Sequence, residues 1–121
     1  RDSDVKDLAP EYMKYFLREL RKRPATQEVM RWELSQKNEI TRSLAAIREE
    51  QGMEMMDFLE HRLKLKDQLD IKALTALISA GISYLVLRGK TADVFLGIRI
   101  NDDSGWERIE KVIEVIFREL L

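Results

Sequence analysis

The chain has 121 residues, enough for one domain with a substantial hydrophobic core and too few for two. Its 21 lysines and arginines nearly balance 22 aspartates and glutamates, so the formal net charge is −1. A nucleic-acid-binding surface is normally markedly basic, and this balance argues against one on these residues. Cysteine is absent and histidine occurs once, which excludes disulfides, thiolate metal centres and multi-histidine metal sites. We therefore expect no metal ion and no other cofactor.

The start of the chain carries no recognisable targeting signal. Arg1-Asp2-Ser3-Asp4 is charged, whereas a secretory signal peptide needs an apolar core. The first residue is also not an initiating methionine. We expect a cytoplasmic protein, and we expect this chain to be a fragment of a longer one.

Apolar residues recur at three- to four-residue spacing through most of the chain, a pattern typical of amphipathic helices. Pro10 fits the first turn of the first helix, and Pro24 follows the end of that helix. Asn38 and Asp70 stand where the third and fourth helices need N-cap residues. The sequence predicts one domain, an all-α helical bundle, with residues 64–70 as a connector. We place its helices at residues 8–22, 25–36, 39–63, 70–88 and 104–121.

Small residues stand out inside two of these helices. Gly52 lies in the middle of the third, where glycine costs about 1 kcal/mol relative to alanine. It indicates close approach of a neighbour, a bend, or space for something that is not protein. Thr75, Ser79 and Ser83 recur at i, i+4 and i+8 in the fourth helix. We interpret this stripe as tight helix packing first and as ligand contact second.

The connection between the last two helices has a different pattern. Between Thr91 and Ile100, apolar residues alternate with others, which indicates extended structure. The sequence offers no partner strand elsewhere. We therefore expect an ordered loop packed over the helices.

The fourth helix is apolar on almost every side. Ala73 to Leu87 contains no charged residue, yet these fifteen residues are fewer than the roughly 20 that a bilayer-spanning helix needs. A helix that is apolar all round must be covered on more than one side. A chain of this length has few helices to provide that cover. We therefore expect part of this surface to meet a second copy of the chain.

The last helix also has a broad apolar face. Ser104 and Glu107 have the spacing of a capping box, and Glu114 precedes Arg118 in the favourable i,i+4 order. Two wide-faced helices at the end of a chain predict a symmetric homodimer joined by an intermolecular four-helix bundle. The candidate interface residues are Leu77, Ile78, Gly81, Ile82, Leu85, Ile109, Val112, Ile113, Ile116 and Leu120.

Two long segments carry a family resemblance. They are RPATQEVMRWELSQKNEITRSLAAIREEQG, residues 23–52, and TALISAGISYLVLRGKTADVFLGIRINDDSGWERIE, residues 75–110. In order and spacing they resemble the C-terminal ligand-binding and dimerisation domain of the TetR family of bacterial transcriptional repressors. The matching features are a Trp-Glu-Leu segment before the long helix and a Gly-Trp-x-x-Ile segment that opens the final one. The resemblance covers residues 9–121.

The resemblance implies a division of labour. Family members begin with a helix-turn-helix domain that reads DNA as a dimer, and nothing in this chain matches that domain. We therefore expect these residues to sense a ligand and to dimerise, and DNA to be bound only through the missing N-terminal domain. A small molecule among the central helices would then release the full-length protein from its operator.

The same resemblance implies a ligand pocket among the central helices. Methionine suits apolar cavities of irregular shape, and tyrosine and tryptophan combine an apolar body with one hydrogen-bonding group. A small apolar or aromatic ligand is expected for the set, although core packing is the better explanation for any one of these residues taken singly. The candidate ligand-binding residues are Tyr12, Phe16, Met30, Trp32, Leu44, Ile47, Met53, Met56 and Tyr84.

Two alternatives stay open. One is a helical dimerisation module without a ligand. The other is a small all-α dimeric enzyme that clamps an anionic substrate with arginines, as chorismate mutases do. The sequence contains no phosphate-binding loop, nucleophile elbow or HExxH motif, so we assign no catalytic residue and expect no enzyme. The arginines available to such an enzyme are Arg18, Arg31, Arg42 and Arg48.

Overall fold

The computed structural model describes residues 2–63 and 69–121. These residues form an all-α helical bundle, which confirms the predicted fold class. The predicted connector lies largely outside the described residues. The elements are α1 (Asp2–Lys22), α2 (Pro24–Ser35), α3 (Glu39–Leu63), α4 (Ile71–Arg88), β1 (Val94–Phe95), β2 (Ile98–Arg99) and α5 (Asp103–Leu120).

The N-caps of two helices are as predicted. Asn38 Oδ1 accepts a hydrogen bond from the Thr41 backbone N–H at 3.0 Å, and Asp70 Oδ1 accepts one from Ala73 at 3.0 Å. The predicted start of α1 was wrong, because that helix begins at Asp2 and Pro10 lies inside it. Ala9 is only 2 % exposed, so the packed face of α1 already includes the residue before the proline.

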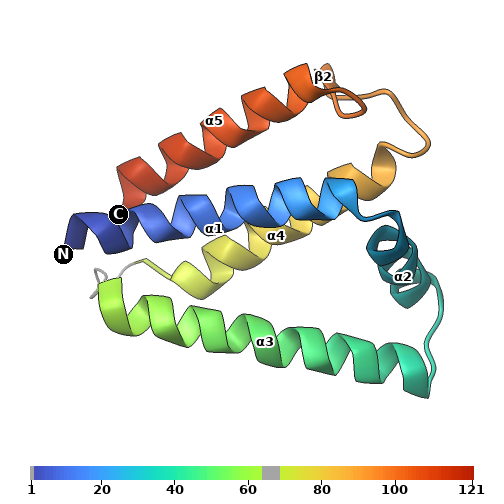
Figure 1. The fold of residues 1–121 in the computed structure, drawn as a ribbon, viewed down its shortest axis with the longest axis horizontal. Coiled ribbons are helices and arrows are strands. Elements are labelled where there is room, and N and C mark those ends of the chain that lie inside the picture. Colours follow the sequence, from blue (N-terminus) through green and yellow to red (C-terminus); the bar gives the residue numbers. More distant parts are fainter. Residues whose placement is uncertain (1, 64–68) are drawn as a thin grey trace.

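Helix α1 runs through the middle of the molecule, with α5 along one side and α3 along the other (Figure 1). It packs against every other helix of the described chain. Its inner face supplies four apolar side chains at helical spacing, and the other helices cover them. The main core residues are Ala9, Met13, Leu17 and Leu20 of α1, Met56 and Leu59 of α3, Ile71, Ile82 and Val86 of α4, and Trp106, Ile113 and Phe117 of α5.

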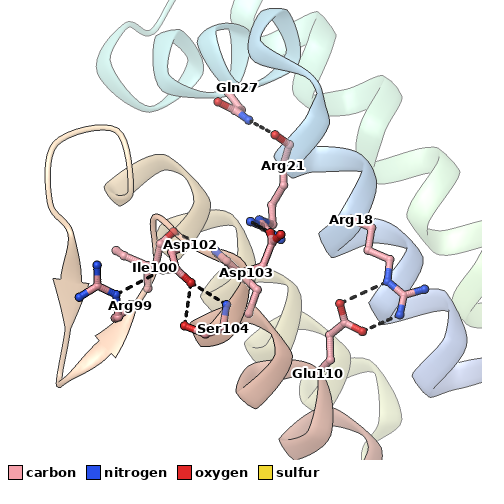
Figure 2. Close-up of polar contacts among 10 residues, drawn as sticks. Arg18, Arg21, Gln27, Arg99, Ile100, Asp102, Asp103, Ser104 and Glu110 are labelled. Carbon is pink, nitrogen blue, oxygen red and sulfur yellow. Dashed lines mark hydrogen bonds and ion pairs between the residues drawn. The ribbon is translucent and has the colours of Figure 1, made fainter.

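Ion pairs fix how α1 lies along α5. Arg18 donates from Nη2 to Glu110 Oε1 at 2.6 Å and from Nε to Oε2 at 3.2 Å. One turn further along α1, Arg21 Nη2 donates to Asp103 Oδ1 at 2.9 Å. Figure 2 shows both contacts, with the cations on α1 and the carboxylates on α5. Their order along the two helices is consistent with antiparallel packing.

The connection before α5 is a small β-hairpin and not the loop expected from sequence. Val94 lies opposite Arg99 and Phe95 opposite Ile98 in an antiparallel pair. The two turn residues, Leu96 and Gly97, have φ angles of 50° and 82°. A two-residue turn with a positive φ at both positions matches the twist of the flanking strands, so the two strands can pair with each other. No partner strand from elsewhere is therefore needed.

The start of α5 also differs from prediction. The helix begins at Asp103, so Ser104 lies in its first turn and the expected capping box with Glu107 does not form its N-cap. The N-cap is Asp102, whose Oδ1 accepts hydrogen bonds from the backbone N–H and the hydroxyl of Ser104, both at 2.7 Å (Figure 2). A carboxylate at this position satisfies a free N–H and favours the positive end of the helix dipole.

The Gly-Trp pair in the first turn of α5 ties the helix to the hairpin. A Cβ atom on Gly105 would lie 2.0 Å from the carbonyl oxygen of Arg99, so only glycine fits there. Trp106 is 1 % exposed, and its indole N–H donates to the Ile100 carbonyl at 2.9 Å. The glycine thus lets the hairpin approach closely enough for the indole to reach it.

Candidate ligand-binding groove

A groove of about 820 Å³ lies among α1, α3 and α4, with a contribution from α2. All five methionines of the chain line it. Tyr12 and Phe16 of α1 add two aromatic rings. Methionine side chains are flexible and polarisable, so such a lining adapts to apolar ligands of different shapes. The methionines are Met13, Met30, Met53, Met55 and Met56.

Gly52 lies in the wall that α3 contributes. A Cβ atom on it would meet nothing within 4 Å, so no close neighbour explains the glycine. The space beside it belongs to the groove. Of the interpretations offered by the sequence, this geometry favours room for something that is not protein.

The opposite wall is formed by three turns of α4. Thr75, Ser79 and Ser83 line the groove together with the small residues Ala76 and Ala80. Ser79 Oγ donates to the Thr75 carbonyl at 2.7 Å, which satisfies its hydroxyl within the helix. The hydroxyl stripe therefore borders the groove, which favours its second interpretation, ligand contact, over tight packing against another helix. Small side chains along this wall widen the groove.

Two cations at the groove are held by carboxylates. Arg48 Nη1 donates to Glu33 Oε1 at 2.5 Å. Lys72 Nζ lies 3.4 Å from both Asp57 Oδ1 and Glu60 Oε1. Hydrogen bonding to Asp57, followed by the charge of Glu60, raises the pKa of Lys72 above its ordinary value. Both cations therefore have a carboxylate partner before any ligand arrives.

The groove contains five of the predicted ligand-binding residues and lacks four. Helix geometry explains why Trp32 and Tyr84 do not line the groove. Met30 lines the groove, and Trp32, two residues further on, is rotated by about 200° around α2. Trp32 is accordingly 41 % exposed. Ile47 is 56 % exposed on α3, and Leu44 lies one turn before Arg48, where the groove lining on that helix begins. The five that line it are Tyr12, Phe16, Met30, Met53 and Met56.

Tyr84 belongs to a different surface. It is 51 % exposed and packs edge-on against Phe95 of the hairpin, with 5.7 Å between ring centroids. Its neighbour Ser83 lines the groove, and one residue on a helix is a rotation of about 100°. Tyr84 therefore does not line the groove with the other predicted ligand contacts.

Sequence reasoning missed several lining residues. Met13, Arg48 and Glu49 line the groove and were not among the predicted ligand contacts. The Thr75, Ser79 and Ser83 stripe was interpreted as packing first and as ligand contact second. The methionines are the sequence signal that indicates the groove, because all of them line it. The lining residues absent from the ligand-binding prediction are Met13, Arg48, Glu49, Gln51, Gly52, Met55, Lys72, Ala73, Thr75, Ala76, Ser79, Ala80 and Ser83.

The predicted dimer residues divide into exposed, half-buried and core positions. Leu77 is 74 % exposed, Val112 56 % and Leu120 46 %. Ile82 and Ile113 are each 3 % exposed and lie in the core of the single chain, so they drop out of the candidate interface. Gly81 is also exposed, and the half-buried positions are Ile78, Leu85, Ile109 and Ile116.

The exposed face of α4 is unusually apolar. The expectation that this segment is too short for a bilayer does not hold for the whole helix. By length and composition alone, the 18 residues Ile71–Arg88 could cross a membrane, and only 17 % of them are buried. A Cβ atom on Gly81 would meet nothing within 4 Å, so the protomer itself does not use the small size of this residue. A small residue on an exposed helix face allows another helix to approach closely.

Three of the four arginines of the enzyme alternative are paired with three different carboxylates. Arg18 pairs with Glu110 of α5, Arg31 with Glu28 of its own helix, and Arg48 with Glu33. Among residues 2–63 and 69–121, no group of three or more histidine, aspartate or glutamate side chains is arranged to hold a metal ion.

Comparison with known proteins adds no relative. No protein-family model matches the sequence, and neither the curated proteins nor the solved structures contain a match.

Proposed function

We propose that this chain is the effector-binding and dimerisation domain of a TetR-type transcriptional repressor. A small apolar or aromatic ligand occupies the groove, two copies pair through α4 and α5, and DNA is bound only by a separate N-terminal domain. Ligand binding releases the full-length, cytoplasmic protein from its operator. The domain itself is not an enzyme. This mechanism requires the ligand to bind the two conformations of the repressor with different affinity.

The groove is the observation that carries this proposal. Its volume of about 820 Å³ lies within the range of small-molecule sites, roughly 300–1,000 Å³. Its lining joins the methionines to Tyr12, Phe16 and a small-residue wall. A module that only dimerised would have no need for such a space. The groove therefore favours ligand binding over dimerisation alone.

The second copy accounts for the exposed apolar face. Leu77, Val112 and Leu120 expose large fractions of their surface, and removal of apolar area from water stabilises association by roughly 25 cal/mol per Å² before the entropic costs of binding. The apolar character of α4 fits a helix that is covered by a partner. A lipid bilayer is the alternative partner for this apolar face, and co-sedimentation with vesicles tests for it.

Two glycines separate ligand binding from dimerisation experimentally. Gly52→Leu fills the groove, and Gly81→Leu places a bulky side chain on the exposed face of α4; neither new side chain has a close neighbour at its Cβ position. Leucine also favours helix more than glycine does, so both variants should fold. The uncharged fluorescent probe N-phenyl-1-naphthylamine reports groove binding, and sedimentation velocity reports dimerisation.

The proposal predicts that each variant loses one property, probe binding or dimerisation, and keeps the other. Gly52→Leu should lose most probe binding and remain a dimer, whereas Gly81→Leu should weaken the dimer and keep probe binding. Equal probe binding by wild type and Gly52→Leu would contradict the ligand site. A wild-type chain that is monomeric at micromolar concentration would contradict the dimer. Co-sedimentation with phosphatidylcholine vesicles would show that a membrane, and not a second copy, covers the exposed apolar face.

A further inference from the structure

The cationic side chains that line the groove have carboxylate partners, whereas one carboxylate that lines it takes part in no ion pair of the described residues. The two cations, Arg48 and Lys72, are each held by at least one carboxylate. Glu49 also lines the groove, and none of the ion pairs among residues 2–63 and 69–121 involves it. An incoming anion would have to compete with existing carboxylates for either cation. An incoming cation would meet a carboxylate that has no such partner.

Glu33 does not line the groove, but it holds Arg48, a cation that does, and it strengthens this asymmetry. Glu33 uses Oε1 to hold Arg48, while its Oε2 is buried and accepts no hydrogen bond from the described residues. Its side chain is 11 % exposed. A buried carboxylate with one unsatisfied oxygen keeps the surroundings of Arg48 electronegative. The guanidinium is therefore a poor anchor for another anion.

The apolar lining suits a cation as well. Tyr12 and Phe16 contribute aromatic rings, whose faces attract ammonium groups through their quadrupole. The methionine sulfurs are soft and polarisable and carry no positive charge. A carboxylate at the rim with aromatic rings in the wall is a combination that recognises positive charge on an apolar body.

We propose that the ligand of this groove is a lipophilic cation, an amine or quaternary ammonium group carried on an apolar or aromatic body. This inference rests on the proposed function, because it requires the groove to be a ligand site. The cationic group lies towards Glu49, and the apolar body lies over the methionines of α3 and the small-residue wall of α4.

Three probes of equal chain length test the charge preference. They are n-octyltrimethylammonium, n-octanol and n-octanesulfonate, each used as a competitor of N-phenyl-1-naphthylamine bound to the 121-residue chain. The cation should bind at least about fivefold more tightly than the sulfonate, with octanol between them. Added NaCl should reduce this difference, since the Glu49 side chain is at the surface.

A matched pair of variants assigns the preference to one residue. Glu49→Gln removes the groove carboxylate, whereas Glu50→Gln removes an exposed carboxylate that does not line the groove. Glu49→Gln should reduce the affinity for octyltrimethylammonium several-fold and leave octanol unchanged. Glu50→Gln should change neither affinity.

The outcomes separate this inference from the proposed function. Equal binding of the three probes, or tightest binding of octanesulfonate, would overturn the charge preference and leave the groove as a ligand site. Equal effects of Glu49→Gln and Glu50→Gln would overturn the role of Glu49. If neither the fluorescent probe nor any octyl compound binds, the ligand site itself fails.

Discussion

The ammonium group of Lys14 lies 2.6 Å from Oε1 of Glu114, although 100 residues separate them in the sequence. Glu11, one turn before Lys14 on α1, lies 3.0 Å from the same nitrogen. Lys14 is only 8 % exposed, so most of its surface is withdrawn from water. A lysine in that position needs its carboxylates, because an unpaired buried charge is strongly unfavourable. This contact joins α1 to α5 beside the two arginine pairs.

The Lys14–Glu114 pair predicts a specific pH dependence. The hydrogen bond from Lys14 lowers the pKa of Glu114 below its ordinary 4.5, and the hydrogen bond to Glu114 raises the pKa of Lys14 above 10.5. The contribution of Glu114 is therefore present above pH 4.5 and is lost as the pH falls through its lower folded-state pKa. The contribution of Lys14 is present below pH 10.5 and is lost as the pH rises through its folded-state pKa.

Glu114→Gln tests this dependence. The variant should be less stable than wild type in urea unfolding at pH 7, and the difference should narrow at pH 3. Glu119→Gln, which removes an exposed carboxylate from the same helix, should show no such pH-dependent difference. A stability difference of the same size at pH 7 and pH 3 would show that the charge of Glu114 does not contribute as described.

The Arg18–Glu110 pair predicts recovery on charge reversal. Arg18→Glu places two carboxylates together and should lower stability, as should Glu110→Arg, which places two guanidinium groups together. The double variant restores opposite charges across the same helix contact. It should be more stable than either single variant, and added salt should reduce all of these effects. If the changes in unfolding free energy of the two single variants simply add up in the double variant, Arg18 and Glu110 do not interact as described.

Gly105 and Gly52 predict opposite responses to the same substitution. Gly105→Ala drives a Cβ atom into the Arg99 carbonyl and should destabilise the chain by about 2–3 kcal/mol or more. Gly52→Ala adds a methyl group to open space in a helix and should stabilise it by about 0.5–1 kcal/mol. Urea unfolding measures both. A stabilising Gly105→Ala would mean that the hairpin does not approach α5 this closely.

Local patterns were sufficient to predict most of the fold. The spacing of apolar residues located the five helices, and the short polar side chains of Asn38 and Asp70 marked two helix starts. Long-range partners were harder to predict. Glu114 was paired locally with Arg118, but it forms its hydrogen bond with Lys14 of α1, because tertiary packing brings that buried cation to it.

The site could be predicted only in part for the same reason. Sequence spacing shows which residues share a helix face, and it does not show which neighbouring helix that face meets. Trp32 and Tyr84 have the chemistry of ligand contacts, but each is rotated away from a groove residue close to it in sequence. The hydroxyl stripe of α4 has the composition of a packing surface, and whether another helix covers it depends on the tertiary arrangement.

Methionine-methyl NMR tests the central claim, a ligand site in the groove, most directly. All five methionines of the chain line that groove, so ¹³C-methyl labelling of methionine places every signal at the site. Saturating N-phenyl-1-naphthylamine should shift these signals, most strongly those of the half-buried Met30, Met53 and Met55, and Gly52→Leu should abolish the shifts. Bound probe, seen by its fluorescence, with unchanged methionine signals would place the ligand elsewhere and contradict the account.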